Sequence, residues 1–163
     1  MNSSKPPEAH RDLTLLERRE IEAGITGPIL KAFIRKFGTE ACLETLREVI
    51  SELARTQGKE LARILGDTSL EVFAQTLENW KAGHALEIEI LEQNDEKLEF
   101  NVTRCRYAEM YQRLGLQELG STLSCLRDFE LVKGFNPDLE LQRNQTIMEG
   151  ASHCDFRFSK KPD

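Results

Sequence analysis

The sequence predicts an α+β fold, with N-terminal helices followed by a four-stranded antiparallel sheet packed by helices. Up to residue 84, apolar residues recur every three or four positions, as on one side of a helix. From residue 85 the interval becomes two, which is typical of half-buried strands. Helical and strand patterns then alternate, so the expected element order is α-α-α-α-β-β-α-α-β-β.

Two short helices are expected first. The segment TLLE, Thr14–Glu17, has the spacing of a capping box and opens a helix that should end near Gly24. In the segment TGPILKAFIRKFG, Pro28 occupies a first-turn position and Gly38 is a helix stop. A separate second helix is therefore expected between them.

A third helix is expected over Thr39–Leu65, bent or broken at Gly58. Its apolar residues form one stripe, which we interpret as core that leaves no surplus apolar face for a partner; the stripe contains Leu43, Leu46, Val49, Ile50 and Leu53. A second capping box, Thr68–Glu71, opens a fourth helix that should end at Gly83.

The period of two begins in a β-hairpin that turns around Asn94–Asp95. One face of the hairpin is apolar and the other is acidic and solvated; the apolar positions are Leu86, Ile88, Ile90, Leu98, Phe100 and Val102. Two helices should follow, from Arg106 to Leu114 and from Leu116 to Val132. The segments NPDLELQRNQTIM and HCDFRF are the expected third and fourth strands.

These elements make one domain, residues 13–158, with a helical half (13–84) and a half that carries the sheet and the site (85–158). Residues 1–12 are expected to be a disordered lead, and residues 159–163 a loose tail.

Composition narrows the function class. The net charge is −6 with acids and bases interspersed, whereas nucleic-acid binding needs a concentrated basic face. No apolar run approaches the roughly 20 residues that span a bilayer, and the first residues lack the apolar segment of a secretory signal. We therefore expect a cytoplasmic protein with reduced cysteines and no nucleic-acid or membrane partner. An oligomer remains open.

Arg143 is the most informative polar residue. It falls in phase with Leu139 and Leu141 on the buried face of the third strand. A buried arginine needs a partner. That partner is either an internal carboxylate, Asp128 or Glu109, or the carboxylate of a substrate held in two-point contact.

Cys105 lies between a strand and a helix N-terminus, flanked by Arg104 and Arg106. The helix dipole and both cations would lower the pKa of its thiol, as in a reactive thiolate. The alternative is an inert, buried cysteine, which is the commoner fate of a free thiol.

Cys125 and Asp128 are three residues apart and share a helix face with Phe129. An aspartate on a partly apolar face also needs a partner. It could orient a base, bind Arg143, or form a surface pair with Arg127.

In the fourth strand, Cys154 shares the inward face with Phe156 and Phe158, while His153 and Asp155 point outward. The adjacent histidine, cysteine and aspartate therefore cannot form a compact triad.

A metal site is a weaker alternative. Cys105, Cys125 and Cys154 with His153 could hold zinc or an iron–sulfur cluster. Their spacing is long and the sequence has no CxxC pair. It also has no P-loop and no GxGxxG. We therefore expect no metal and no cofactor.

The strings RCRYAEMYQRLG and LSCLRDFELVKGFNPDLELQRNQTIMEGASHCDFRF resemble the C-terminal core of the L-2-amino-thiazoline-4-carboxylic acid hydrolase family. The resemblance implies a bacterial hydrolase that opens a cyclic amidine-like C–N bond in a carboxylate-bearing small molecule. A cysteine would attack the amidine carbon or lie beside an activated water. The residues implicated as catalytic are Cys105, Cys154, Cys125, Asp128, Glu109 and His153, and those implicated in substrate binding are Arg143, Thr146 and Arg104.

The last elements also resemble, more distantly, the 4-vinyl-reductase-type small-molecule-binding domain, through a glycine turn followed by a strand with C-x-F. That resemblance implies a pocket between sheet and helices. It supplies a rival function, which is ligand binding or sensing without turnover.

Overall fold

One antiparallel sheet organises the C-terminal half of the computed structural model, which describes residues 12–162. Its strands are β1 (Leu86–Gln93), β2 (Lys97–Cys105), β3 (Leu139–Gln142) and β4 (Cys154–Lys160). Their spatial order is β1-β2-β4-β3. Apart from Asp12, the expected lead lies outside the described residues.

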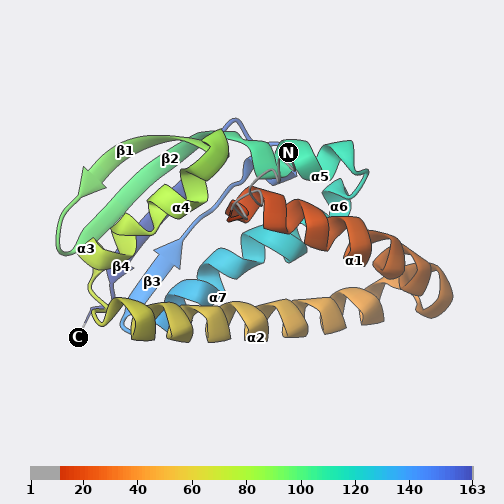
Figure 1. Cartoon of the computed structure of the whole chain (residues 1–163), viewed down its shortest axis with the longest axis horizontal. Helices are drawn as coiled ribbons and strands as arrows, with labels where there is room; N and C mark the ends of the chain where they lie inside the picture. Colours follow the sequence, from red (N-terminus) through yellow and green to blue (C-terminus); the bar gives the residue numbers. More distant parts are fainter. Residues whose placement is uncertain (1–11, 163) are drawn as a thin grey trace, which may run out of the picture.

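Helices precede the sheet and also separate β2 from β3 (Figure 1). The first group contains α1 (Leu15–Phe37), α2 (Thr39–Leu65), α3 (Leu70–Gln75) and α4 (Leu77–Lys81). The second contains α5 (Arg106–Arg113), α6 (Gln117–Gly120) and α7 (Leu126–Phe135), and a π-helical turn, Ser121–Cys125, joins α6 to α7. Short 3-10 turns occupy Ala82–His84 and Ile147–Glu149. The predicted fold class and element order are confirmed.

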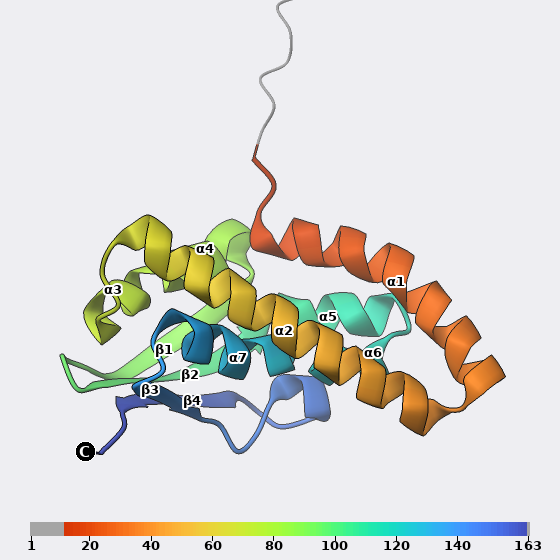
Figure 2. The same ribbon diagram turned by 90° about the horizontal axis from the view of Figure 1, so that it is seen from below.

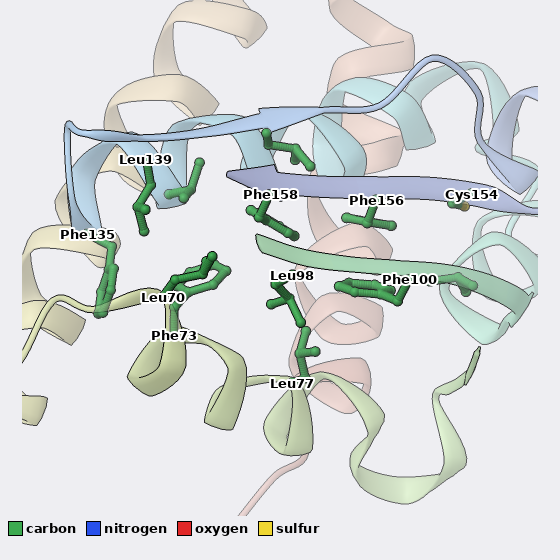
Figure 3. Close-up of a cluster of buried hydrophobic side chains, with 13 residues drawn as sticks. Leu70, Phe73, Leu77, Leu98, Phe100, Phe135, Leu139, Cys154, Phe156 and Phe158 are labelled. Carbon is green, nitrogen blue, oxygen red and sulfur yellow. The ribbon is translucent and has the colours of Figure 1, made fainter. Parts of the chain in front are cut away.

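Two apolar cores meet inside the molecule. In the first, α3, α4 and α7 cover one face of the sheet, and phenylalanine rings from β2 and β4 stack on each other. Figure 3 shows Leu70, Phe73 and Leu77 pointing from α3 and α4 toward these strands. The second core joins α1, α2, α5 and α6. Leu86 and Cys105 pack against both cores and so mark the boundary between them.

The structure corrects the first helical boundary. The predicted capping box is present, because Thr14 Oγ1 accepts from the Glu17 N–H, but the helix does not end near Gly24. The helix continues through Pro28, ends before Gly38 and is 23 residues long in total. On the C-terminal side of the proline, Leu30 and Ile34 pack against the second core, and Lys31 Nζ donates to the Gly115 carbonyl at 2.7 Å. That packing outweighs the hydrogen bond that proline removes.

Gly58 does not break α2, which runs without interruption from Thr39 to Leu65. A Cβ at Gly58 would lie 2.1 Å from the Leu131 carbonyl oxygen in α7, and a Cβ at Gly134 would lie 2.1 Å from the Arg55 carbonyl oxygen in α2. The two glycines therefore allow the backbones of α2 and α7 to approach closely. Figures 1 and 2 both show these helices side by side.

The fourth predicted helix is also different in detail. Its N-cap is Ser69, whose Oγ accepts from the Val72 N–H, so the expected Thr68–Glu71 capping box is wrong by one residue. The helix is interrupted at Thr76, where α3 ends and α4 begins. Thr76 Oγ1 donates to the Phe73 carbonyl at 2.6 Å, which satisfies that hydroxyl within the buried break.

The last two strands have different lengths from those expected. β3 stops at Gln142, and shortly after it the N–H groups of Asn144 and Gln145 donate to the Asp155 carboxylate instead of to a strand. β4 extends to Lys160, which pairs with Leu139, two residues past the expected domain boundary.

The outer face of α1 carries a surplus apolar surface, which corrects our interpretation of the helix stripes. Its residues are four apart and 48–64% exposed; they are Ile21, Ile25, Ile29, Phe33 and Phe37. On α2, Leu46 and Ile50 are buried, but Val49 and Leu53 of the same predicted stripe are exposed. Within residues 12–162, no helix combines the length and apolarity needed to cross a bilayer.

Candidate functional site

A cavity of about 90 Å³ lies where the two cores meet. Its walls are largely apolar; they include Leu15, Trp80, Leu86, Val102, Leu131 and Phe156. Polar side chains from five different parts of the chain also face it; they are Arg19, Cys105, Tyr107, Ser124, Cys125, Arg127, Asp128, Arg143 and Cys154. An apolar pocket with a few convergent polar groups is the usual form of a small-molecule site.

Three free cysteines line this cavity. Cys105 ends β2 and caps α5, and Cys125 ends the π-helical turn. Cys154 opens β4, opposite Val102 in the register, and Figure 3 shows it in line with Phe156 on the inward face. The predicted strand phase of Cys154 is thus confirmed. π-Helical turns are frequent at functional sites.

Burial sets the acidity of these thiols. It raises the pKa of Cys105 to about 11, although the backbone N–H groups of Ala108 and Tyr107 act in the opposite direction. The expectation of a low pKa at Cys105 is therefore wrong. Its flanking cations do not reach the thiol, because Arg104 is exposed and Arg106 donates to the Gly83 carbonyl. Burial also raises the pKa of Cys125 and of Cys154.

The shifted pKa of Cys105 predicts a loss of stability at high pH. The folded value of about 11 exceeds the ordinary value of 9.0, so the unfolded chain loses this proton first as pH rises. The Cys105 thiol therefore contributes on the order of 2 kcal/mol to the free energy of unfolding. This contribution is complete below about pH 8.5 and is lost progressively as the pH rises to about 11. Urea unfolding of the wild-type protein and of Cys105→Ser at several pH values measures this contribution, because only the wild-type protein carries the Cys105 thiol. Identical pH slopes for the two proteins would contradict the assignment.

Arg143 forms the internal salt bridge that was one of its two predicted partnerships. Its Nη1 donates to Asp128 Oδ2 at 2.5 Å, its Nη2 donates to the Cys125 carbonyl at 2.9 Å, and its side chain is only 4% exposed. The guanidinium carbon lies 4.8 Å from the Phe129 ring centroid and 4.9 Å from that of Phe156. Its two terminal nitrogens and its ring-facing surfaces are therefore already engaged.

The paired charges influence each other. Burial raises the pKa of the Asp128 carboxyl, and the positive charge of Arg143 opposes that shift. Burial alone would lower the pKa of Arg143, but Asp128 raises it above the ordinary value. The pair places a carboxyl group of increased basicity on the cavity wall beside the cysteines.

Two predicted site residues lie outside the cavity, on the surface. Arg104 Nε donates to Glu109 Oε1 at 2.8 Å, and its Nη1 lies 3.5 Å from Glu87. All three side chains are about half exposed or more. Arg104 and Glu109 therefore lie outside the cavity that the three cysteines share, although both line a separate surface pocket with Cys105.

His153 and Thr146 are also not among the residues that line the cavity. Ser152 Oγ lies 3.0 Å from His153 Nδ1, and Gln145 Nε2 donates to the His153 carbonyl at 3.1 Å. Thr146 is buried, but it caps the following 3-10 turn and donates to Glu149 Oε2 at 2.8 Å. Both residues organise the loop between β3 and β4.

Asp155 holds that loop from the outer face of β4. Its Oδ1 accepts from the Asn144 N–H at 3.0 Å and from the Gln145 N–H at 2.9 Å. Burial would raise its pKa, but these backbone donors lower it below the ordinary value. Asp155 thus positions the segment directly after Arg143.

The sequence interpretation missed the buried Arg19 and considered Arg127 only as a surface partner of Asp128, whereas both arginines are 8% exposed. A detectable signal exists for both. Arg19 lies in the same helical phase as Leu16 and Ala23, and Arg127 follows Leu123 by four residues. The same argument from phase identified Arg143.

No three His, Cys, Asp or Glu side chains in residues 12–162 are grouped so that they could hold a metal ion. The alternative site built from the three cysteines and His153 has no geometric support, since His153 lies outside the cavity that the cysteines share.

Comparisons with known proteins agree with the fold. One similar solved structure is a trafficking protein particle complex subunit 3 from Naegleria fowleri, covalently bound to palmitic acid; the TM-score is 0.54 with 9% identity over 89% of this chain and 96% of that one. Another is the phenol-responsive sensory domain of the transcription activator PoxR with phenol; the TM-score is 0.54 with 9% identity over 85% of this chain and 74% of that one. At this identity the likeness shows the fold alone.

No curated protein matches the sequence. The family comparison does match, across residues 18–158, which include the first core, the second core except Leu15 and Leu16, and every cysteine of the cavity. This chain belongs to the L-2-amino-thiazoline-4-carboxylic acid hydrolase family.

Proposed function

We propose that this protein hydrolyses a C–N bond in a small cyclic amidine that bears a carboxylate, of the 2-amino-thiazoline-4-carboxylate type. The observation that carries the proposal is the cavity itself, where three thiols adjoin the partly buried Asp128–Arg143 pair. Family membership supports the same class of reaction.

The size and walls of the cavity favour a compact ring. Its volume of about 90 Å³ is well below the roughly 300–1,000 Å³ of sites for drug-sized ligands. Trp80, Leu86 and Phe156 offer apolar surface to the faces of a ring. Burying those surfaces together removes water from the reacting groups.

Cys154 is the nucleophile that the surroundings favour. Burial raises the pKa of its thiol, but two groups act in the opposite direction, the Ile147 N–H, which donates to Sγ at 3.2 Å, and the charge of Arg143. Asp128 lies near enough to raise the pKa of Cys154 further, and it is the group proposed to accept the thiol proton.

The proposed reaction has two steps. Cys154 Sγ bonds to the amidine carbon while Asp128 takes the thiol proton and passes it to the ring nitrogen, and the C–N bond then breaks. Water next attacks the same carbon and displaces the thiol, which regains a proton. The sum is the addition of one water across the C–N bond.

Incubation with 2-amino-thiazoline-4-carboxylate, followed by liquid chromatography and mass spectrometry, tests the proposal. We expect ring opening with a gain of one water, reduced at least about 100-fold in Cys154→Ser. Cys42→Ser is the matched control, because Cys42 lies on α2 and does not line the cavity. Undiminished turnover by Cys154→Ser would exclude this nucleophile. No turnover of any cyclic amidine by the wild-type protein would exclude the hydrolase.

A second candidate is ligand binding without turnover. It is favoured by the raised pKa values of all three cavity thiols, which keep them neutral in the resting protein. The similar solved structures with phenol and with palmitic acid illustrate that this fold can enclose a ligand. Native mass spectrometry would then detect a co-purified small molecule that stays unchanged on incubation.

A further inference from the structure

We infer that Arg127, assisted by Arg19, forms a carboxylate-binding subsite in the cavity wall, and that Arg143 does not serve this purpose. The inference deepens the proposed function and rests on it for the identity of the ligand, a small cyclic monocarboxylate. The observation is that Arg127, which lines the cavity, has a buried guanidinium with one nitrogen that lacks a hydrogen-bond partner.

The hydrogen bonds of Arg127 are incomplete. Nε donates to the Leu123 carbonyl at 2.8 Å, and Nη2 lies 3.6 Å from Glu22 Oε2. Among the described residues, Nη1 of Arg127 is the one buried side-chain nitrogen or oxygen atom without a hydrogen-bond partner. Buried polar groups are nearly always paired, so an unpaired one calls for an explanation. An anion in the cavity would supply the missing acceptor.

The charge at this end of the cavity is also unbalanced. Arg19 and Arg127 are both buried, and Glu22 is the carboxylate that pairs with both of them. Its stronger contact is with Arg19, at 2.7 Å. Two guanidinium groups facing one carboxylate leave one positive charge, and a ligand carboxylate would compensate it.

The electrostatics of Arg127 agree with this picture. Burial lowers the pKa of Arg127, and the positive charge of Arg19 lowers it further. Asp128 cannot relieve the unbalanced charge in the same way, because Arg143 already holds its carboxylate at 2.5 Å. A bound anion would favour the charged guanidinium that burial and Arg19 disfavour.

The geometry also decides between the two candidate clamps. Arg143 uses Nη1 for Asp128 and Nη2 for the Cys125 carbonyl, and two aromatic rings cover it. Both of its terminal nitrogens already donate to acceptors of the protein, which makes Arg143 less suited than Arg127 to two-point contact with a ligand. Arg127 retains Nη1, and its Nη2 is beyond hydrogen-bonding distance of Glu22, so that edge remains available.

Binding of an unreactive ligand tests the subsite apart from catalysis. The probes are thiazole-4-carboxylate, which lacks the amidine, and its neutral carboxamide, both measured by isothermal titration calorimetry. We expect the wild-type protein to prefer the carboxylate by about 10- to 100-fold, as for a hydrogen-bonded charge pair. Arg127→Met should remove that preference, and Arg127→Lys should restore part of it.

Two further variants keep the test decisive. Glu22→Gln removes the competing carboxylate and should tighten carboxylate binding, and this result does not depend on the folding of an Arg127 variant. Arg113→Gln is the matched control, since Arg113 pairs with Glu20 on the surface and should leave both affinities unchanged.

Two outcomes would overturn the inference. The first is that the wild-type protein binds both probes equally or binds neither detectably. The second is that the carboxylate preference persists in a folded Arg127→Met variant. Carboxylate selectivity through Arg127 without any amidine turnover would support the subsite and exclude the hydrolase. Turnover that needs Cys154 but is unaffected by substitution of Arg127 would support the hydrolase and exclude the subsite.

Discussion

Replacing Arg143 by alanine is expected to lower the free energy of unfolding by about 3–5 kcal/mol, because it leaves Asp128 as an unpaired carboxylate on a buried wall. The loss includes the hydrogen bond to the Cys125 carbonyl and the packing between two phenylalanine rings. Urea denaturation monitored by circular dichroism measures it. Arg143→Lys should recover only part, since a lysine cannot donate to both partners in the same plane.

A surface variant and a double variant distinguish the stability lost with the Arg143–Asp128 pair from the effect of removing any positive charge. Arg104→Ala breaks an exposed pair with Glu109, and we expect a change of at most about 1 kcal/mol. The double variant Arg143→Met with Asp128→Leu should be more stable than Arg143→Ala, because it removes the stranded charge. If Arg143→Ala unfolds like the wild-type protein but loses carboxylate binding, the residue is a ligand clamp after all.

The second large effect is expected at the crossing of α2 and α7. Gly134→Ala and Gly58→Ala each place a Cβ 2.1 Å from a backbone carbonyl oxygen of the other helix. A backbone carbonyl cannot move aside as a side chain can, so the helices must separate. We expect a net loss of about 1–3 kcal/mol in each variant, measured as a lower midpoint of urea unfolding.

Gly24→Ala is the matched control for these variants. Gly24 also lies inside a helix, but no atom lies within 4 Å of the Cβ position. There the gain in helix propensity should stabilise the protein by about 0.5–1 kcal/mol. A gain of similar size at Gly134 would show that the two helices can separate without cost.

Local patterns in the sequence predicted much of the fold. The alternation of Cys154, Phe156 and Phe158 set the inward face of β4, and the phase of Arg143 predicted its burial. The capping box at Thr14 was likewise found where expected. These features depend on neighbours within a few residues, so one sequence suffices to predict them.

The errors have a common origin in contacts between distant segments. Pro28 and Gly58 are helix breakers by local propensity, yet packing against α5–α6 and α7 holds both helices continuous. Cys105 has the flanking residues of a reactive thiol, but burial by two cores raises its pKa. Arg104 and Glu109 are near Cys105 in sequence and face solvent instead.

The sequence by itself determined the fold class, the family, the buried faces of β2 and β4, and five of the charged or thiol groups that meet in the cavity, which are Cys105, Cys125, Asp128, Arg143 and Cys154. Only the tertiary structure decided how those groups are paired. In the folded protein, Asp128 pairs with Arg143, and Nη1 of Arg127 has no hydrogen-bond partner. The physical reason is that helix and strand periods act along the chain, whereas desolvation and charge pairing depend on distances through space.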